Sequence, residues 1–250
     1  MSLSETLASL GLHHTAQHLD DLVALAARKR WSATQTLEYL GQQEAQARAE
    51  RSLKSRLKTA RLGAFKPLCD FDWAWPKQID RLACQAALRL DFVSQAHNVL
   101  FIAPHGLGKT MLAKNLLHQA VLAGHSALFV SAAQLLLDLG AQESSAALER
   151  RLRHYARPHL LCIDEVGYLS FDARNADLLY QVVSRRYEHR SIVLTTNLAF
   201  SEWPSVFPST TIATALIDRL VHHALILPIS GDSYRKRDAQ LAASSRRSAS

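Results

Sequence analysis

The chain reads Asn98-Val99-Leu100-Phe101-Ile102-Ala103-Pro104-His105-Gly106-Leu107-Gly108-Lys109-Thr110 and then continues as a helical pattern from Met111 to Leu122. The first five residues form a short apolar run, which predicts a buried strand. The glycines let successive backbone N–H groups turn toward one anion, and the N-terminus of the following helix adds a partial positive charge. The pattern G-x-x-x-x-G-K-[ST] is nearly complete, so this stretch predicts a phosphate-binding loop between a strand and a helix.

All residues from Ala103 to Met111 are therefore candidate nucleotide contacts. Lys109 is expected to reach the β- and γ-phosphates, and Thr110 is expected to offer its hydroxyl to Mg²⁺. Ala103 stands where the pattern has its first glycine, a mild departure because that position ends the strand and need not adopt a positive φ. A chance Gly-rich turn is the alternative interpretation, and the flanking strand and helix count against it.

A second apolar strand, predicted over residues 157–165, ends in the adjacent carboxylates Asp164 and Glu165. Asp164 is expected to hold Mg²⁺ through the water shell of the ion, and Glu165 to orient and deprotonate an attacking water. Taken alone, such a pair is weak evidence for a metal site, because acidic residues are also common at the beginning of helices. The interval after Thr110 has room for a helix, a strand over 126–130 and another helix, which predicts an α/β fold with a doubly wound parallel sheet.

A third strand, predicted over residues 191–196, is followed by Asn197. At the carboxyl end of a strand beside the Asp164 strand, the Asn197 side chain is placed to touch the γ-phosphate or the attacking water. Taken alone, Asn197 is typical of a turn. Together with the other two motifs it is interpreted as a sensor of the nucleotide.

These residues resemble the IstB-type AAA+ ATPases, the helpers of insertion-sequence transposition, which are related to the DnaC helicase loader. The most specific segments are D-E-x-G-Y-L from Asp164, N-L-x-F-S-E-W from Asn197 and D-R-L-x-H-H from Asp218, and the resemblance covers nearly the whole chain. It implies a P-loop AAA+ sheet with flanking helices, ATP and Mg²⁺ as cofactors, and Mg²⁺-dependent ATP hydrolysis.

The resemblance also implies roles for two arginines. Arg219, in D-R-L, matches an arginine finger that reaches the nucleotide of a neighbouring subunit, and Arg235, in S-Y-R, matches a second sensor that contacts the phosphates of its own chain. A planar guanidinium suits charge that develops on a transferring phosphoryl group. Without the resemblance, each is interpreted as a surface arginine. His222 and His223 are interpreted as structural, because adjacent residues point apart on a helix and no acid or Cys partner has ligand spacing.

Residues 1–66 carry helical patterns only, over 4–12, over 15–30, and from a capping box at Ser32-Ala33-Thr34-Gln35 to about Leu62. The last helix is expected to carry one basic face, formed by Arg51, Lys54, Lys58 and Arg61. That face is suited to DNA phosphates, and a solvated face is the alternative. Resemblance to the N-terminal domain of IstB favours duplex DNA. No base-reading motif appears, so binding should be largely independent of sequence.

Composition fits this interpretation. The chain has 250 residues, 48% of them hydrophobic, and a formal net charge of +7, which permits one large and one small domain and favours a polyanionic partner. Cys69, Cys84 and Cys162 form no C-x-x-C pair and are interpreted as reduced thiols of a cytoplasmic protein. No apolar run approaches the roughly 20 residues of a membrane span, and the N-terminus lacks a signal pattern, so no membrane contact is expected.

The sequence therefore predicts an N-terminal helical DNA- and partner-binding domain over 1–66, an AAA+ ATPase domain over 67–235, and a disordered basic tail over 236–250. The aromatic segment 70–76 is expected to form a loop at the domain boundary near the adenine, and the alternative is that its aromatic side chains are core anchors. The resemblance implies an ATP-dependent DNA-binding helper that forms homo-oligomers on DNA and stimulates a cognate transposase. The alternatives are a DnaC-like helicase loader, or a non-hydrolysing, ATP-gated DNA-binding scaffold in which Ala103 weakens phosphate binding.

Overall fold

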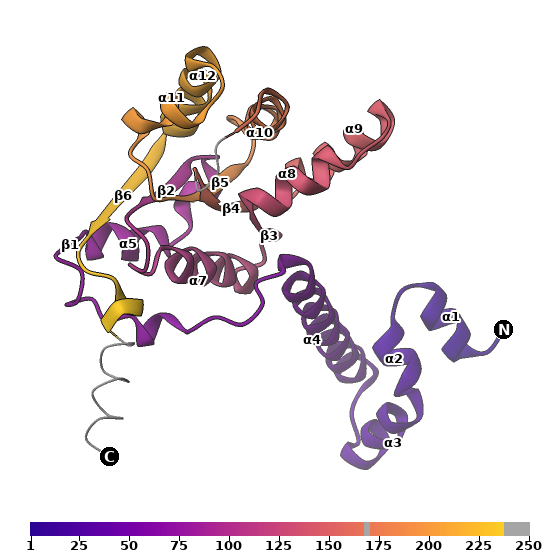
Figure 1. Ribbon diagram of the computed structural model, residues 1–250. Helices are drawn as coiled ribbons and strands as arrows, with labels where there is room; N and C mark the ends of the chain where they lie inside the picture. The colour runs from indigo at the N-terminus through magenta and orange to yellow at the C-terminus, as the bar shows by residue number, and fades with distance from the viewer. Residues whose placement is uncertain (168–170, 238–250) are drawn as a thin grey trace, which may run out of the picture. The chain divides into compact units, whose positions relative to one another are not determined.

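The computed structural model of the protein describes residues 1–167 and 171–237 (Figure 1). The chain divides into two compact units, residues 1–55 and 56–250, so the division falls inside helix α4 (Ala33–Ala60). The last turns of α4 pack with the second unit, because Arg56 Nε donates to the Val121 carbonyl at 3.2 Å and Ala60 is fully buried. A domain boundary between 66 and 67 stays a prediction.

The first unit consists of helices α1 (Leu3–Ser9), α2 (His13–Gln17), α3 (Leu19–Lys29) and most of α4. The predicted capping box starts α4: Ser32 N–H donates to Gln35 Oε1 at 2.8 Å, and Gln35 N–H donates to Ser32 Oγ at 3.2 Å. The prediction of one continuous helix over 15–30 was wrong, because His18 adopts φ −116° and ψ 23° and separates α2 from α3.

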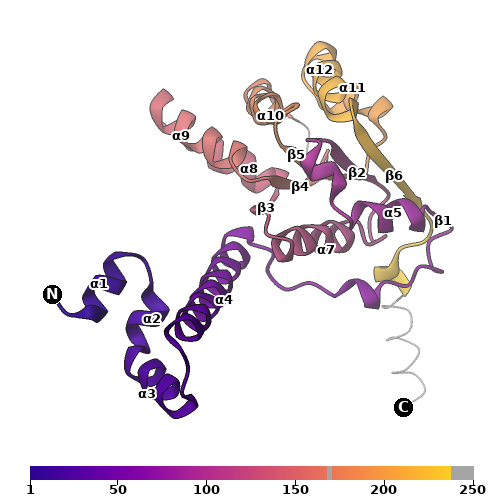
Figure 2. The same ribbon diagram turned by 180° about the vertical axis from the view of Figure 1, so that it is seen from behind.

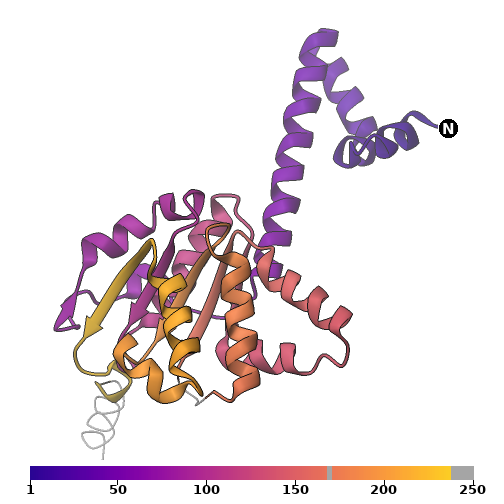
Figure 3. The same ribbon diagram turned by 90° about the horizontal axis from the view of Figure 1, so that it is seen from above.

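The second unit is built on one six-stranded sheet in the order β1-β6-β2-β5-β4-β3 (Figure 3). Strands β2 to β6 pair in parallel, whereas the short edge strand β1 pairs antiparallel with β6. The predicted AAA+ parallel sheet is confirmed, and the antiparallel edge was not foreseen. The strands are β1 (Gln78–Ile79), β2 (Asn98–Ile102), β3 (Ala127–Ser131), β4 (Leu160–Val166), β5 (Ser191–Thr196) and β6 (Ala224–Ser230).

Helices cover both faces of the sheet. Helix α7 (Lys109–Leu122) lies on one side, and α8, α10 and α12 lie on the other (Figures 1 and 2). Leu100, Leu161 and Leu194 point into the core under the second group of helices and are fully buried. The remaining helices and turns are α5 (Arg81–Ala87), α6 (Asp91–Ser94), α8 (Ala132–Gly140), α9 (Ser145–Ala156), α10 (Ala173–Arg186), α11 (Trp203–Val206), α12 (Thr210–Val221), and the 3-10 turns η1 (Leu68–Asp70) and η2 (Phe200–Glu202).

Because β2, β4 and β5 run parallel, their carboxyl ends meet at one edge of the sheet. The segments that follow them carry the phosphate-binding loop, the acidic pair and Asn197. In open α/β sheets this edge is where ligands bind.

Candidate nucleotide-binding site

The phosphate-binding loop needs its glycines for conformation and for space. Gly106 has φ 81° and Gly108, the N-cap of α7, has φ 85°, both in the left-handed region that favours glycine. A Cβ on Gly106 would lie 2.0 Å from Ser233 Oγ, and one on Gly108 would lie 2.6 Å from Phe71 Cε2. Ala103 does not share this conformation and is not among the residues with a positive φ, so its Cβ is tolerated where the pattern has glycine.

Lys109 is held by the loop that it follows. Its Nζ donates to the carbonyl of Ala103 at 2.6 Å and to the carbonyl of Pro104 at 2.9 Å. The side chain is buried, which lowers the pKa of the ammonium, while Asp164 and Glu165 oppose that shift. A phosphate that replaced these carbonyl groups as acceptor would bind the Lys109 ammonium, which is already buried and directed toward the loop.

Asp164 and Thr110 are in contact, as a shared Mg²⁺ site requires. Thr110 Oγ1 lies 3.1 Å from each carboxylate oxygen of Asp164, at the end of β4. Hydroxyl and carboxylate oxygens are ligands that Mg²⁺ prefers. These two residues therefore fit the role predicted for them, namely holding Mg²⁺ beside a bound nucleotide.

A third residue, Thr195 of β5, joins this pair and was missed in the sequence. Its hydroxyl donates to Asp164 Oδ1 at 2.6 Å and accepts the Glu165 N–H at 2.9 Å. Thr195 is fully buried near the carboxyl end of β5, and no local sequence pattern distinguishes it from the adjacent buried Thr196.

Glu165 leaves the regular sheet. The pairing of β4 with β5 shifts register between Ile163 and Val166, and Glu165 has φ 61°. Bulges of this kind re-aim a side chain and are common beside active sites. The Glu165 side chain is exposed and lines the cavity described next, whereas Asp164 is buried.

A cavity of about 490 Å³ lies over the loop, and most of the predicted site residues line it. Glu165, Asn197 and Arg235 come from three different segments of the chain and meet there. The cavity is also lined by the loop residues His105, Gly106, Gly108, Lys109, Thr110 and Met111. Of the predicted catalytic residues, only Arg219 is absent from the described residues that line this cavity.

Asp70, Phe71 and Asp72 of the aromatic segment form one wall of this cavity, together with Tyr234, Arg235 and Arg237 of the C-terminal segment. Tyr234 N–H donates to the Gly106 carbonyl at 2.9 Å, and its hydroxyl donates to the Asp72 carbonyl at 2.5 Å. Trp75 Nε1 donates to the Asp232 carbonyl at 2.7 Å, and Phe71 is buried against Gly108. Proximity of this wall to the adenine stays a prediction. Of the predicted tail, Lys236 and Arg237 are described, and Arg237 pairs with Asp72 at 3.3 Å, while 238–250 lie outside the described residues.

Arg219 lies elsewhere. It is in the last turn of α12, with its guanidinium 4.8 Å from the ring centroid of Tyr180. Its carbonyl is 3.5 Å from Asn98 Nδ2, at the start of β2, whereas the phosphate-binding loop follows the end of β2. Arg219 therefore has no route to the nucleotide of its own chain in this arrangement.

His222 and His223 were predicted to lie on a helix and to have no acid partner, and both predictions were wrong. Helix α12 ends at Val221, so the two residues are not on a helix, and their ring centroids lie 3.8 Å apart. An acid partner exists as well, because Glu188 Oε1 lies 3.9 Å from His222 Nδ1.

The predicted basic face is not uniform. Arg51 pairs with the buried Glu44 at 2.9 Å, and Arg61 lies beyond the end of α4 with φ 53°. Lys54 and Lys58 are exposed on the helix. Among the four residues predicted to bind DNA, Lys54 and Lys58 are the two that lie on α4 and form no ion pair with an acid in the described chain.

The fold and the cavity define a nucleotide-binding protein of the P-loop AAA+ class. A sequence model for the family described as IstB-like ATP binding protein matches residues 5–242. The chain therefore belongs to the IstB-like family, as the motifs indicated.

Individual relatives agree with this assignment. The chain is 38% identical over 240 residues to the insertion sequence IS21 putative ATP-binding protein of Pseudomonas aeruginosa, covering 96% of this chain and 91% of the relative. It is 36% identical to the corresponding IS232 protein of Bacillus thuringiensis, with 94% of each chain covered. The crystal structure of DnaI has the same fold, with a TM-score of 0.55 at 18% identity, over 68% of this chain and 92% of that one. No helix in the described part of the chain is long and apolar enough to cross a membrane.

Proposed function

We propose that this protein is a Mg²⁺-dependent ATPase that binds duplex DNA and serves a transposase. The observation that carries the ATPase proposal is that Lys109, Thr110 and Glu165 line one cavity, while the buried Asp164 contacts Thr110. Lys109 supplies a cation to the phosphates, and Thr110 and Asp164 hold Mg²⁺. Glu165 accepts a proton from the attacking water at its carboxylate.

Asn197 and Arg235 are proposed to complete this site from the same chain, since both line the cavity. Arg219 is proposed to complete the site of a neighbouring copy. Arg219 lies away from the cavity of its own chain, and this position supports the role, because an arginine finger that acts in trans contacts the nucleotide of another subunit. Hydrolysis would then depend on assembly into a homo-oligomer, which couples catalysis to whatever promotes assembly.

The DNA and transposase parts of the proposal rest on the relatives, which are named as ATP-binding proteins of insertion sequences. A net charge of +7 and the exposed Lys54 and Lys58 support contact with a DNA backbone in the cytoplasm. Such contact positions a protein on DNA without reading sequence.

The decisive experiment is steady-state phosphate release across protein concentration, with and without long duplex DNA. A specific rate that rises with protein concentration and with DNA is expected. The matched control is Glu165→Gln, which keeps the shape of the side chain and should be about 10²–10⁴-fold slower while still binding ATP. ATP binding without DNA-stimulated hydrolysis by the wild-type chain would instead identify a non-hydrolysing scaffold. Stimulation by a replicative helicase in place of DNA would identify a helicase loader.

A further inference from the structure

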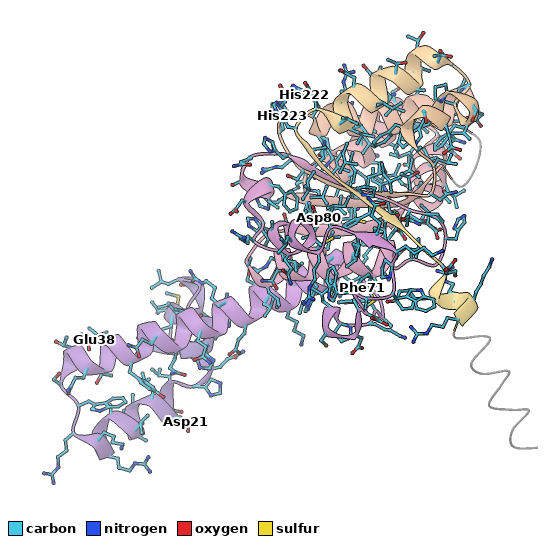
Figure 4. All side chains as sticks on the ribbon, turned by 90° about the vertical axis from the view of Figure 1, so that its left-hand side faces the viewer. Asp21, Glu38, Phe71, Asp80, His222 and His223 are labelled. Atoms are coloured by element: carbon cyan, nitrogen blue, oxygen red, sulfur yellow. The ribbon has the colours of Figure 1, made fainter. Side chains whose placement is uncertain are left out.

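A cluster of three side chains lies at the edge of the sheet opposite the phosphate-binding loop. Glu188 precedes β5, and His222 and His223 precede β6, so all three stand at the amino ends of parallel strands. The phosphate-binding loop follows β2 at its carboxyl end. Figure 4 shows His222 and His223 together and apart from Phe71, the residue packed on that loop. The cluster is therefore separate from the candidate nucleotide site.

The donor atoms of this cluster are close enough to share one cation. One carboxylate oxygen of Glu188 and one ring nitrogen of each histidine all lie within 4.8 Å of one another. Within residues 1–167 and 171–237, this is the one group of three or more His, Cys, Asp or Glu side chains with such spacing. Zinc is bound at about 2.0–2.1 Å by imidazole nitrogen. At a mutual spacing of up to 4.8 Å, side-chain rotation is needed to bring the three atoms to bonding distance of a single ion.

The backbone presents two of these residues in a conformation that is uncommon for non-glycine residues. Glu188 has φ 58° and His223 has φ 60°. Neighbouring groups hold both positions: the His223 carbonyl accepts the Asn98 N–H at 3.2 Å, and the buried Arg186 guanidinium donates to the Ser191 carbonyl on the far side of the Glu188 turn at 2.5 Å. Conformations of this kind are found preferentially at binding sites, where the surrounding structure over-determines them.

We propose that Glu188, His222 and His223 form a binding site for a divalent transition-metal ion, with Zn²⁺ as the expected ion. Two imidazoles and one carboxylate match the donors that Zn²⁺ takes, whereas Mg²⁺ and Ca²⁺ take oxygen donors. The Glu188 and His222 side chains are 57% and 47% exposed, so an ion can enter from solvent and a water can occupy the fourth position.

The site would act as a clip beside Arg219. Glu188 belongs to the turn after α10, and the two histidines follow α12, so one ion would join the ends of both helices. The Tyr187 hydroxyl lies 2.8 Å from His222 Nδ1, and the Arg219 guanidinium lies 5.8 Å from the Tyr187 ring centroid. A bound ion would therefore constrain the turn that carries Tyr187, whose ring lies beside the Arg219 guanidinium.

The test is calorimetric titration of the untagged full chain with Zn²⁺, after removal of metals with EDTA and in a buffer that contains Mg²⁺. The wild-type chain is expected to bind one Zn²⁺ per chain and to melt at a higher temperature when Zn²⁺ is added. Glu188→Gln, and His222→Ala with His223→Ala, should each lower the affinity by more than the roughly 10–100-fold that removal of an outer-shell partner costs. Both variants should also show no rise in melting temperature when Zn²⁺ is added.

The matched control is His13→Ala with His14→Ala, which removes two adjacent histidines from the first unit and should leave Zn²⁺ binding unchanged. Co²⁺ titrated in place of Zn²⁺ provides a visible absorption that reports the donor set without reference to ATPase activity. If the double variant at 222 and 223 fails to fold, Glu188→Gln and the Co²⁺ spectrum decide the matter. Failure of the wild-type chain to bind Zn²⁺, or a stoichiometry, affinity and Co²⁺ spectrum unchanged by Glu188→Gln, overturns the proposal.

Discussion

At the scale of single residues, the candidate site depends on a buried hydroxyl as much as on the charged groups. Thr195 contacts Asp164 through its hydroxyl and fixes the Glu165 backbone at the position where β4 leaves the sheet. A valine of the same shape would remove both hydrogen bonds and leave the packing intact. We therefore expect Thr195 to position the acidic pair.

Thr195→Val should retain ATP binding but hydrolyse ATP more slowly, by about 10–100-fold, the range found when outer-shell partners of metal ligands are removed. Thr195→Ser keeps the hydroxyl and should restore most of the rate. The measurement is ATP hydrolysis as a function of Mg²⁺ concentration, with thermal melting as the check on folding. A Thr195→Val enzyme with the wild-type rate and Mg²⁺ dependence would show that the hydroxyl has no part in the site.

At the scale of elements, a buried carboxylate of α4 contacts another helix of the first unit. Glu44 accepts from the Thr15 N–H at 3.0 Å and pairs with Arg51. The Thr15 backbone hydrogen bond, with Arg51, lowers the Glu44 pKa from 4.5 to about 2. A carboxylate with a depressed folded-state pKa stabilises the fold above its unfolded pKa, and that contribution disappears as pH falls through the folded value.

Glu44→Gln should therefore lower the stability of the first unit at neutral pH, and the difference from wild type should shrink between pH 4.5 and about 2. Chemical unfolding followed by far-UV circular dichroism at several pH values provides the comparison. Glu50→Gln, an exposed position on the same helix, is the control and should have little effect. Equal curves for Glu44→Gln and Glu50→Gln would contradict the role given to Glu44.

The exposed basic residues of α4 lead to a separate prediction. Replacing Lys54 and Lys58 with Gln should weaken duplex binding similarly for unrelated sequences, and the slope of log affinity against log salt should fall by about 0.9 for each phosphate that the protein no longer neutralises. Arg51 is left in place because it pairs with Glu44. Arg28→Gln with Lys29→Gln removes the same charge from α3 and serves as the control. Identical salt slopes for the two double variants would mean that this face of α4 does not contact DNA.

The elements that sequence could predict are those whose pattern is local. The strand before the phosphate-binding loop and the strand before Asn197 have the predicted bounds, because each is built on a short apolar run that is visible in the local sequence. The Thr195 hydrogen bonds and the β1–β6 pairing join residues distant in sequence, so no local pattern carries them. The helix end at Val221 was missed for a related reason. His222 and His223 connect α12 to β6, and β6 pairs with β2, a strand distant in sequence.

At the scale of the whole molecule, the arrangement of the second unit separates two groups that one reaction would need. Glu165 faces the cavity at the carboxyl edge of the sheet, and Arg219 lies at the amino edge. A single chain with this arrangement has the proposed general base without the proposed finger. Complete sites would exist only where the Arg219 edge of one copy meets the cavity of the next.

Mixing two inactive variants tests this dependence on assembly. Arg219→Ala should bind ATP but lose most hydrolysis, since such an arginine contributes about 10³–10⁵ in rate in related phosphoryl-transfer systems. Glu165→Gln should also be inactive, but it keeps Arg219. When the two variants assemble together on DNA, some interfaces join an intact Glu165 to an intact Arg219, so activity should reappear and peak near equal proportions.

The controls are mixtures of each variant with inactive Lys109→Ala, which keeps Arg219 but binds nucleotide poorly. Lys109→Ala should therefore restore activity to Arg219→Ala and leave Glu165→Gln inactive. If sedimentation shows mixed assemblies and the mixture of Arg219→Ala with Glu165→Gln stays as inactive as its components, Arg219 does not act across the subunit boundary.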